Sequence, residues 1–306
     1  MNTPVLVVIV GPTAVGKTET CLRLAEHFQT EIVSIDARQF YREMTIGTAK
    51  PTEAERARVP HHLIDTLSIH QPYDVKQFEQ DALQVIATLH RQHRVVIATG
   101  GSGLYAKTLC EGIDEMPAVK AAIRQYWHTR WQTEGPEALV AHLRAIDPLF
   151  CETADLQNPR RVLRALEVFH STGKPYSSFR NQGADVAARP FKIVKVGLNR
   201  PRPVLYERIN RRVEQMVEAG LVEEAQKLYP HRHLTALQTV GYQELFPVFE
   251  QQYDLTEAVR LIQRNSRRYA KRQLTWFRRD ADIKWFDLEE ESLAKIVDYV
   301  GKRWKG

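Results

Sequence analysis

The apolar pattern of the chain begins with residues 5–10, a run of aliphatic side chains that leads directly into a glycine. A strand that is buried on both faces of a sheet has this continuous pattern. Helical spacing follows over residues 18–28, and residues 31–35 have the length and composition of a second strand. A helical stretch over residues 75–90 precedes a third strand at residues 95–99. This alternation predicts an α/β fold with a parallel sheet flanked by helices.

The pattern changes between residues 117 and 183, which are rich in helix-forming residues and contain no convincing strand. We interpret this region as a helical insertion that ends in the polar stretch 181–189. Its large apolar side chains recur at helical spacings: Trp127, Trp131, Leu139, Leu143 and Ile146.

The core resumes with a strand-like segment at residues 192–198, and we expect long helices over residues 203–229 and 255–277. The sequence therefore predicts a discontinuous core, residues 1–115 and 190–306, with residues 116–189 as an inserted helical domain.

The composition is that of a globular protein, because hydrophobic residues make up 43% and charged residues 26% of the 306 residues. The first apolar run is too short to span a membrane, so we expect a cytoplasmic protein. Cys21, Cys110 and Cys151 lie far apart and match no zinc or disulfide spacing.

A local excess of positive charge changes this picture. The net charge is +6, and residues 260–279 carry eight of the basic residues and no acidic one. Such a helix is suited to contact the phosphate backbone of a nucleic acid, although a solvated helical face is the common alternative. The candidates for phosphate contact are Arg264, Arg268, Lys271 and Arg272.

A phosphate-binding loop lies between the first strand and the first helix. Backbone N–H groups of such a loop surround phosphate oxygens, Lys17 neutralises the outer phosphate, and the Thr18 hydroxyl can bind Mg²⁺. The sequence therefore predicts a core like that of the P-loop NTPases with a diphosphate site. The loop consists of Gly11, Pro12, Thr13, Ala14, Val15, Gly16, Lys17 and Thr18, in the pattern GxxxxGK[ST].

A P-loop alone does not identify its ligand. The strand at residues 95–99 ends in Gly100–Gly103 without a carboxylate, which disfavours a motor ATPase. Asp36 follows the second strand and should lie at the same sheet edge as the P-loop. Its carboxylate could bind Mg²⁺, bind a sugar hydroxyl, accept a proton or cap a turn.

Eight motifs, in order over nearly the whole chain, resemble the tRNA dimethylallyltransferase family. They are GPTAVGKT at 11–18, SIDARQFY at 34–41, IGTAKP at 46–51, PHHLID at 60–65, GGSGLY at 100–105, RALEVF at 164–169, VGY at 240–242 and KRQLTWFRR at 271–279.

The resemblance implies transfer of a dimethylallyl group from dimethylallyl diphosphate to N6 of the adenine 3′-adjacent to the tRNA anticodon, with Mg²⁺ bound. It implies that the P-loop, including Lys17, holds the diphosphate. Asp36 would be the general base, and Ser102 would hydrogen-bond near the leaving oxygen and the flipped base. Two departures are Ala37 and Ser102, where the family usually has Ser and Thr.

The resemblance also implies a set of tRNA contacts and a monomeric enzyme that binds the anticodon stem-loop. Arg208 and Arg212, four residues apart on an expected helix, could close over the diphosphate or form a solvated face. The implied tRNA contacts are Asp36, Ala37, Arg38, Gln39, Ser102, Lys120, Asn158, Pro159, Arg160, Arg161, Val162, Gln238, Thr239, Val240, Gly241 and Tyr242.

Three other interpretations of the sequence differ in the acceptor or in the chemistry. A relative could prenylate free AMP, ADP or ATP, although the insertion and the basic helix favour tRNA. A P-loop kinase would transfer phosphate from ATP instead. A non-catalytic RNA-binding protein would leave Lys17, Thr18 and Asp36 without a role.

Overall fold

The computed structural model describes residues 3–180 and 189–305. The predicted polar end of the insertion, residues 181–189, lies outside the described residues except for Arg189. The chain divides into two compact units, Met1–Glu111 with Arg189–Gly306 and Gly112–Ala188.

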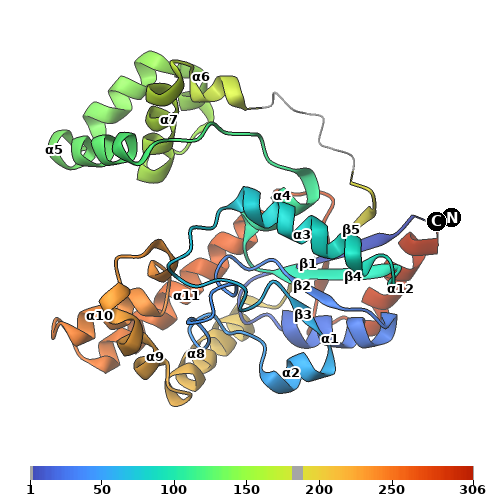
Figure 1. Ribbon diagram of the computed structural model, residues 1–306. Helices are drawn as coiled ribbons and strands as arrows, with labels where there is room; N and C mark the ends of the chain where they lie inside the picture. Colours follow the sequence, from blue (N-terminus) through green and yellow to red (C-terminus); the bar gives the residue numbers. More distant parts are fainter. Residues whose placement is uncertain (1–2, 181–188, 306) are drawn as a thin grey trace. The chain divides into compact units, whose positions relative to one another are not determined.

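A parallel sheet forms the centre of the first unit, with the order β3-β2-β4-β1-β5-β6 among the described residues (Figure 1). This sheet confirms the predicted α/β fold. β1 pairs with β4 on one side and β5 on the other, and all of its residues are buried. The strands are β1 (Val5–Val10), β2 (Ile32–Ser34), β3 (His61–His62), β4 (Val95–Gly100), β5 (Lys192–Asn199) and β6 (Lys284–Asp287).

Helices cover both faces of this sheet (Figure 1). Alternate residues of β1 pack on opposite sides, since successive side chains of a strand point to opposite faces. Val5, Val7 and Ile9 pack with α1, α8 and α12, and the other face packs with α3 and α4. These helices are α1 (Lys17–Phe28), α3 (Val75–Leu89), α4 (Gly103–Glu111), α8 (Arg202–Glu218) and α12 (Leu293–Lys305).

A separate apolar cluster joins the remaining helices of this unit to the long segment after β2. The prediction of one continuous helix over residues 203–229 is wrong. It breaks at Gly220, whose φ of 98° is left-handed and ends α8 before α9 begins. The predicted helix over residues 255–277 is present as α11. The additional elements are α2 (Glu53–Arg58), α9 (Leu221–Leu228), α10 (Tyr242–Phe249), α11 (Leu255–Phe277) and the short 3₁₀ turns Tyr229–His231 and Thr235–Leu237.

The regular elements of the second unit are all helical among its described residues. Trp127, Leu139 and Leu143 form its core with Phe150 and Val162. The expected helical pattern around Trp127 is interrupted at Gly135, which has φ 82° and is followed by a proline. The elements are α5 (Ala121–Ile146), α6 (Pro148–Thr153), α7 (Pro159–Thr172) and a 3₁₀ turn, Tyr176–Phe179.

Candidate active site

The P-loop connects β1 to α1 and keeps its shape through glycines and distant arginines. A side chain at Gly11 would lie 2.6 Å from the carbonyl oxygen of Leu198, so only glycine fits there. Arg200 and Arg208 donate to two carbonyls in the middle of the loop at 2.8 and 2.9 Å. Arg212 lies 3.5 Å from the Thr13 hydroxyl. Arg208 and Arg212, which could close over the diphosphate according to the sequence, therefore both contact the P-loop.

Lys17 lies inside the loop, where Nζ donates to two loop carbonyls at 3.0 and 2.8 Å. Burial, together with the neighbouring charge of Arg212, lowers the pKa of Lys17 to about 8, while Asp36 opposes the shift. Two neighbouring, half-buried cations favour a bound anion, because an anion compensates the repulsion between them. A diphosphate supplies that anion.

A cavity of about 320 Å³ brings the P-loop and the residues after β2 and β4 together. Its polar lining includes Lys17, Thr18, Asp36 and Ser102. The cavity also has an apolar wall, formed by Val240, Leu221 of α9, Ile262 of α11, and Ile209, Val213 and Met216 of α8. The cavity can therefore hold a ligand that is anionic at one end and apolar at the other.

Asp36 contributes a half-buried carboxylate to this cavity. Burial raises its pKa above the ordinary value of an aspartic acid, against the Arg38 amide and the charge of Lys17. The amide of Arg38 donates to Asp36 Oδ1 at 2.9 Å and so orients the carboxylate. A carboxylate with a raised pKa is a stronger base than an exposed one, which suits proton removal.

The two departures from the family pattern contact each other. The amide of Ala37 donates to Ser102 Oγ at 2.9 Å. Because this bond uses an acceptor lone pair of the hydroxyl, the Ser102 O–H can still donate to a substrate. The contact needs only the backbone of residue 37, so alanine preserves it.

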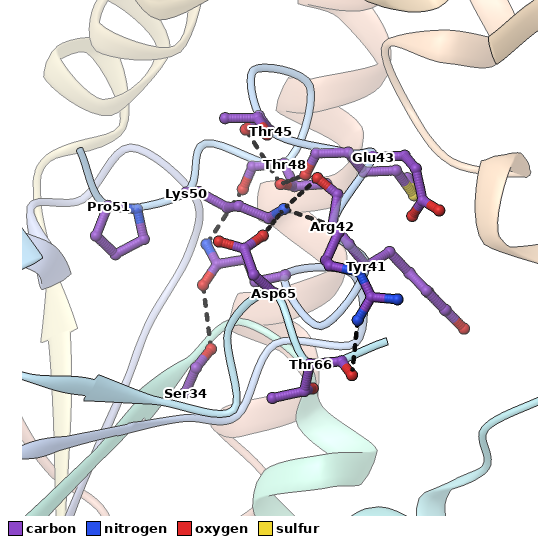
Figure 2. Close-up of polar contacts among 12 residues, drawn as sticks. Ser34, Tyr41, Arg42, Glu43, Thr45, Thr48, Lys50, Pro51, Asp65 and Thr66 are labelled. Atoms are coloured by element: carbon purple, nitrogen blue, oxygen red, sulfur yellow. Dashed lines mark hydrogen bonds and ion pairs between the residues drawn. The ribbon is translucent and has the colours of Figure 1, made fainter. Parts of the chain in front are cut away.

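Lys50 makes the contacts that hold together residues 41–65, part of the long segment that follows Asp36 (Figure 2). Its ammonium group donates to Asp65 at 2.5 Å and to the Tyr41 carbonyl at 2.6 Å, and its side chain is 0% exposed. Arg56 contacts the other carboxylate oxygen of Asp65 at 2.6 Å. The buried Lys50 ammonium therefore joins Tyr41 and Asp65, which belong to no helix or strand.

Gln39, a predicted tRNA contact, takes part in the same arrangement. Its side chain accepts a hydrogen bond from Ser34 at 3.1 Å and donates to the carbonyls of Thr48 and Ala49 at 3.2 and 3.3 Å. Figure 2 shows the bond to Ser34. Gln39 thus joins Ser34, the last residue of β2, to the backbone at residues 48 and 49.

Glu224 of α9 connects this segment to the helices. Its carboxylate accepts from the three successive amides of residues 45–47 at 3.0, 2.8 and 2.9 Å. It also accepts from the hydroxyl of Tyr242 at 2.6 Å. Tyr242 is fully buried, so its side chain anchors the segment at 238–241 and does not itself reach solvent.

The other predicted tRNA contacts fall into two groups. Thr239, Val240 and Gly241 line the cavity, whereas the Gln238 amide donates to the Arg232 carbonyl. The second group lies in the helical unit. Lys120 and the residues Pro159, Arg160 and Arg161 are exposed, Asn158 caps α7 through the Arg160 amide, and Val162 is buried in the core.

The basic helix α11 has two different sides. Arg268, Lys271 and Arg272 are exposed, whereas Tyr269 and Gln273 line the cavity. Two other basic residues of α11 already have partners: Arg264 is half-buried and donates to Asn265, and Arg260 is paired with Glu257 at 2.6 Å.

Sequence reasoning missed Lys50, Glu224 and Gln273. Lys50 lies in the motif IGTAKP and Gln273 in KRQLTWFRR, so their motifs were visible although their contacts were not. Within the described part of the chain, no helix is long and apolar enough to cross a membrane.

Residues 39–280 match the family model of the IPP transferases. A relative from Bacteroides thetaiotaomicron, tRNA dimethylallyltransferase 1, is 48% identical over 297 residues, which cover 97% of this chain and 95% of that protein. A tRNA dimethylallyltransferase from Christiangramia forsetii is 47% identical and covers 96% of this chain and 97% of its own.

Solved structures of transferases that carry related names are also similar to this chain. The full-length tRNA isopentenylpyrophosphate transferase from Bacillus halodurans has a TM-score of 0.71 and 39% identity, with 98% of this chain and 96% of that chain covered. A eukaryotic dimethylallyltransferase described as acting on tRNA has a TM-score of 0.76 and 25% identity, with 93% of this chain and 74% of that chain covered.

Proposed function

The chain belongs to the IPP transferase family, and from this premise we propose that it transfers the dimethylallyl group of dimethylallyl diphosphate to N6 of the adenine 3′-adjacent to the anticodon in tRNA. The observation that carries the proposal is a single cavity lined by the P-loop, the half-buried Asp36 carboxylate and a set of apolar side chains. A kinase that transfers phosphate would not need the apolar wall.

The P-loop binds the diphosphate of the donor in this proposal. Its inward N–H groups, Lys17 and Arg212 surround the phosphate oxygens and stabilise the charge that develops as the diphosphate leaves. The apolar wall accommodates the five-carbon group, so that the reacting carbon points toward Asp36. Ser102, whose hydroxyl can donate, lies beside the leaving oxygen.

The transfer requires one bond to form and one to break. The N6 lone pair attacks the first carbon of the dimethylallyl group, and the bond from that carbon to the diphosphate oxygen breaks. Asp36 takes the proton from N6, which restores a neutral amine. Since the adenine lone pair is delocalised into the ring, a positioned base is needed to make N6 an effective nucleophile.

Mg²⁺ fits the residues of this cavity as a substrate-linked ion. The Thr18 hydroxyl, the proposed protein ligand, lines it, and the described residues contain no cluster of three or more His, Cys, Asp or Glu side chains. Mg²⁺ commonly uses one or two protein oxygens together with substrate phosphates. When bound, it would neutralise charge on the diphosphate.

The acceptor in this proposal is the anticodon stem-loop of tRNA. The exposed cations of α11 contact its phosphates, and the target adenine leaves the base stack to enter the cavity. Because one chain contributes each group named for the reaction, we propose a monomeric enzyme. We place it in the cytoplasm, with its tRNA substrate.

The test supplies the purified protein and Mg²⁺ with donor labelled in the dimethylallyl group. Three acceptors are compared: unmodified tRNA, the same tRNA with guanine in place of the target adenine, and a mixture of AMP, ADP and ATP. The proposal predicts label only in the first tRNA. Label in the free nucleotides, or equal label in both tRNAs, would contradict it.

A further inference from the structure

Two glycines of the turn after β4, Gly101 and Gly103, pack so closely against helix α11 that no side chain would fit at their positions. A methyl group on Gly101 would overlap the Gln273 amide, and one on Gly103 would overlap the Trp276 ring. Gly100 lies against the backbone of Ile35, the residue before Asp36. The position of Ser102 in this turn is therefore set by β2 on one side and α11 on the other.

Gln273 connects this turn to the P-loop. Its Oε1 accepts from the Thr13 amide at 2.9 Å, and its Nε2 donates to the Gly101 carbonyl at 2.8 Å. The side chain is buried, with the residue 5% exposed. A primary amide provides an acceptor and a donor at fixed separation, so both bonds can form only when the P-loop and the Gly101 turn are correctly spaced.

The two ends of this connection serve different parts of the reaction. Thr13 belongs to the loop that binds the donor diphosphate. Gly101 precedes Ser102, whose hydroxyl contacts the amide beside Asp36. A fixed spacing between these ends places the reacting carbon at a fixed distance from the base, and displacement by about 1 Å can slow a reaction about 100-fold.

We propose that Gln273 is a positioning residue that holds the donor half of the active site in register with the half that contains Asp36 and Ser102. Gln273 also lies on the helix whose other side exposes Arg268, Lys271 and Arg272. This inference rests on the proposed prenyl transfer.

The first test replaces Gln273 with methionine, which keeps the length of the side chain and removes both hydrogen bonds. At saturating tRNA and donor, the single-turnover rate should fall about 10- to 100-fold. Affinity for inorganic diphosphate, measured by calorimetry, and affinity for tRNA, measured by filter binding, should each change less than about threefold. Gly101→Ala, which displaces the amide, should give the same pattern.

A second variant separates positioning from general loss of structure. Gln273→Glu keeps the acceptor for Thr13, but its ionised carboxylate repels the Gly101 carbonyl. Burial favours the neutral acid, which can donate to that carbonyl. The rate of Q273E relative to wild type should therefore rise as pH falls, whereas the relative rate of Q273M should not change.

The outcomes distinguish this inference from the proposed function. A wild-type protein that does not transfer the dimethylallyl group would contradict both the proposed function and the role of Gln273. If the wild type is active, a Q273M variant with the wild-type rate would refute the inference alone. A loss of rate matched by an equal loss of folded protein in a thermal melt, or a pH-independent Q273E ratio, would also refute it.

Discussion

At the residue scale, the pKa values of Asp36 and Lys17, two of the titratable groups that line the cavity, are shifted in opposite directions. Burial raises the pKa of Asp36 and lowers that of Lys17 to about 8. A base must be ionised to accept a proton, and Lys17 must be protonated to bind a diphosphate. Each shift therefore narrows the pH range in which both groups are in the active form.

We predict a bell-shaped dependence of kcat/KM on pH. Activity should fall on the acid side as Asp36 becomes protonated, at a pH above the ordinary aspartate value. It should fall on the alkaline side as Lys17 loses its proton near pH 8. Residual activity of Lys17→Arg should lack the alkaline fall, because a guanidinium stays charged. A wild-type profile that is flat to about pH 10, the ordinary range of a lysine, would contradict the role of Lys17.

Removing the Lys17 ammonium should act on the donor and spare the RNA. In Lys17→Ala, we expect transfer to be abolished and affinity for inorganic diphosphate to fall, while filter binding of tRNA stays largely unchanged. Lys227→Ala, at an exposed position of α9, is the matched control and should retain activity. An equal loss of tRNA and diphosphate binding in Lys17→Ala would show that Lys17 supports the fold.

At the element scale, the contact between Glu224 and Tyr242 joins α9, α10 and the segment after β2. Tyr242→Phe removes one hydrogen bond to a carboxylate that three amides also contact. A hydrogen bond to a charged group contributes about 1.5–3 kcal/mol, so we expect a loss of that size in the free energy of unfolding.

Chemical denaturation measures this loss, and Tyr229→Phe is its control. The Tyr229 hydroxyl also donates to a carboxylate, that of Glu250, but at the surface. Its removal should leave the stability nearly unchanged. Equal stability changes in the two variants would show that the Tyr242 contact has no special role.

The exposed side of α11 predicts how salt affects tRNA binding. Replacing Arg268 and Lys271 with glutamine should weaken binding and lower the slope of log affinity against log salt by about 0.7 to 0.9 for each phosphate that is no longer neutralised. Arg260→Gln should change the slope less, since Arg260 is already paired with Glu257. An unchanged slope in the folded double variant would exclude these two residues as phosphate contacts.

At the scale of the whole molecule, local pattern was enough to predict the central strands and the P-loop. The segments at residues 5–10 and 95–99 are apolar runs, residues 192–198 are mainly aliphatic with two lysines, and the three segments form β1, β4 and β5. β3 and β6 were missed because both are short: His61–His62 has two residues, and Lys284–Asp287 has four, with a charged residue at each end. The break at Gly220 was missed because apolar spacing continues across it.

The contacts that organise the site could not be predicted from local pattern. Glu224 meets residues 45–47, and Gln273 meets Thr13, across most of the chain length. Which partner each polar side chain finds depends on how the helices pack. Motif resemblance indicated that these segments matter, but the pairing of Lys50 with Asp65 depends on how the whole segment folds in space.

In the proposed reaction, Asp36 accepts the proton while the P-loop holds the diphosphate in the same cavity. Rapid-quench single-turnover transfer to tRNA, with wild type and Asp36→Asn at saturating substrates, tests it most directly. Because asparagine is nearly isosteric but cannot act as the base, the rate should fall about 10²- to 10⁴-fold, with diphosphate and tRNA affinities changed only modestly. An Asp36→Asn variant that transfers the dimethylallyl group at a rate near that of wild type would contradict the account.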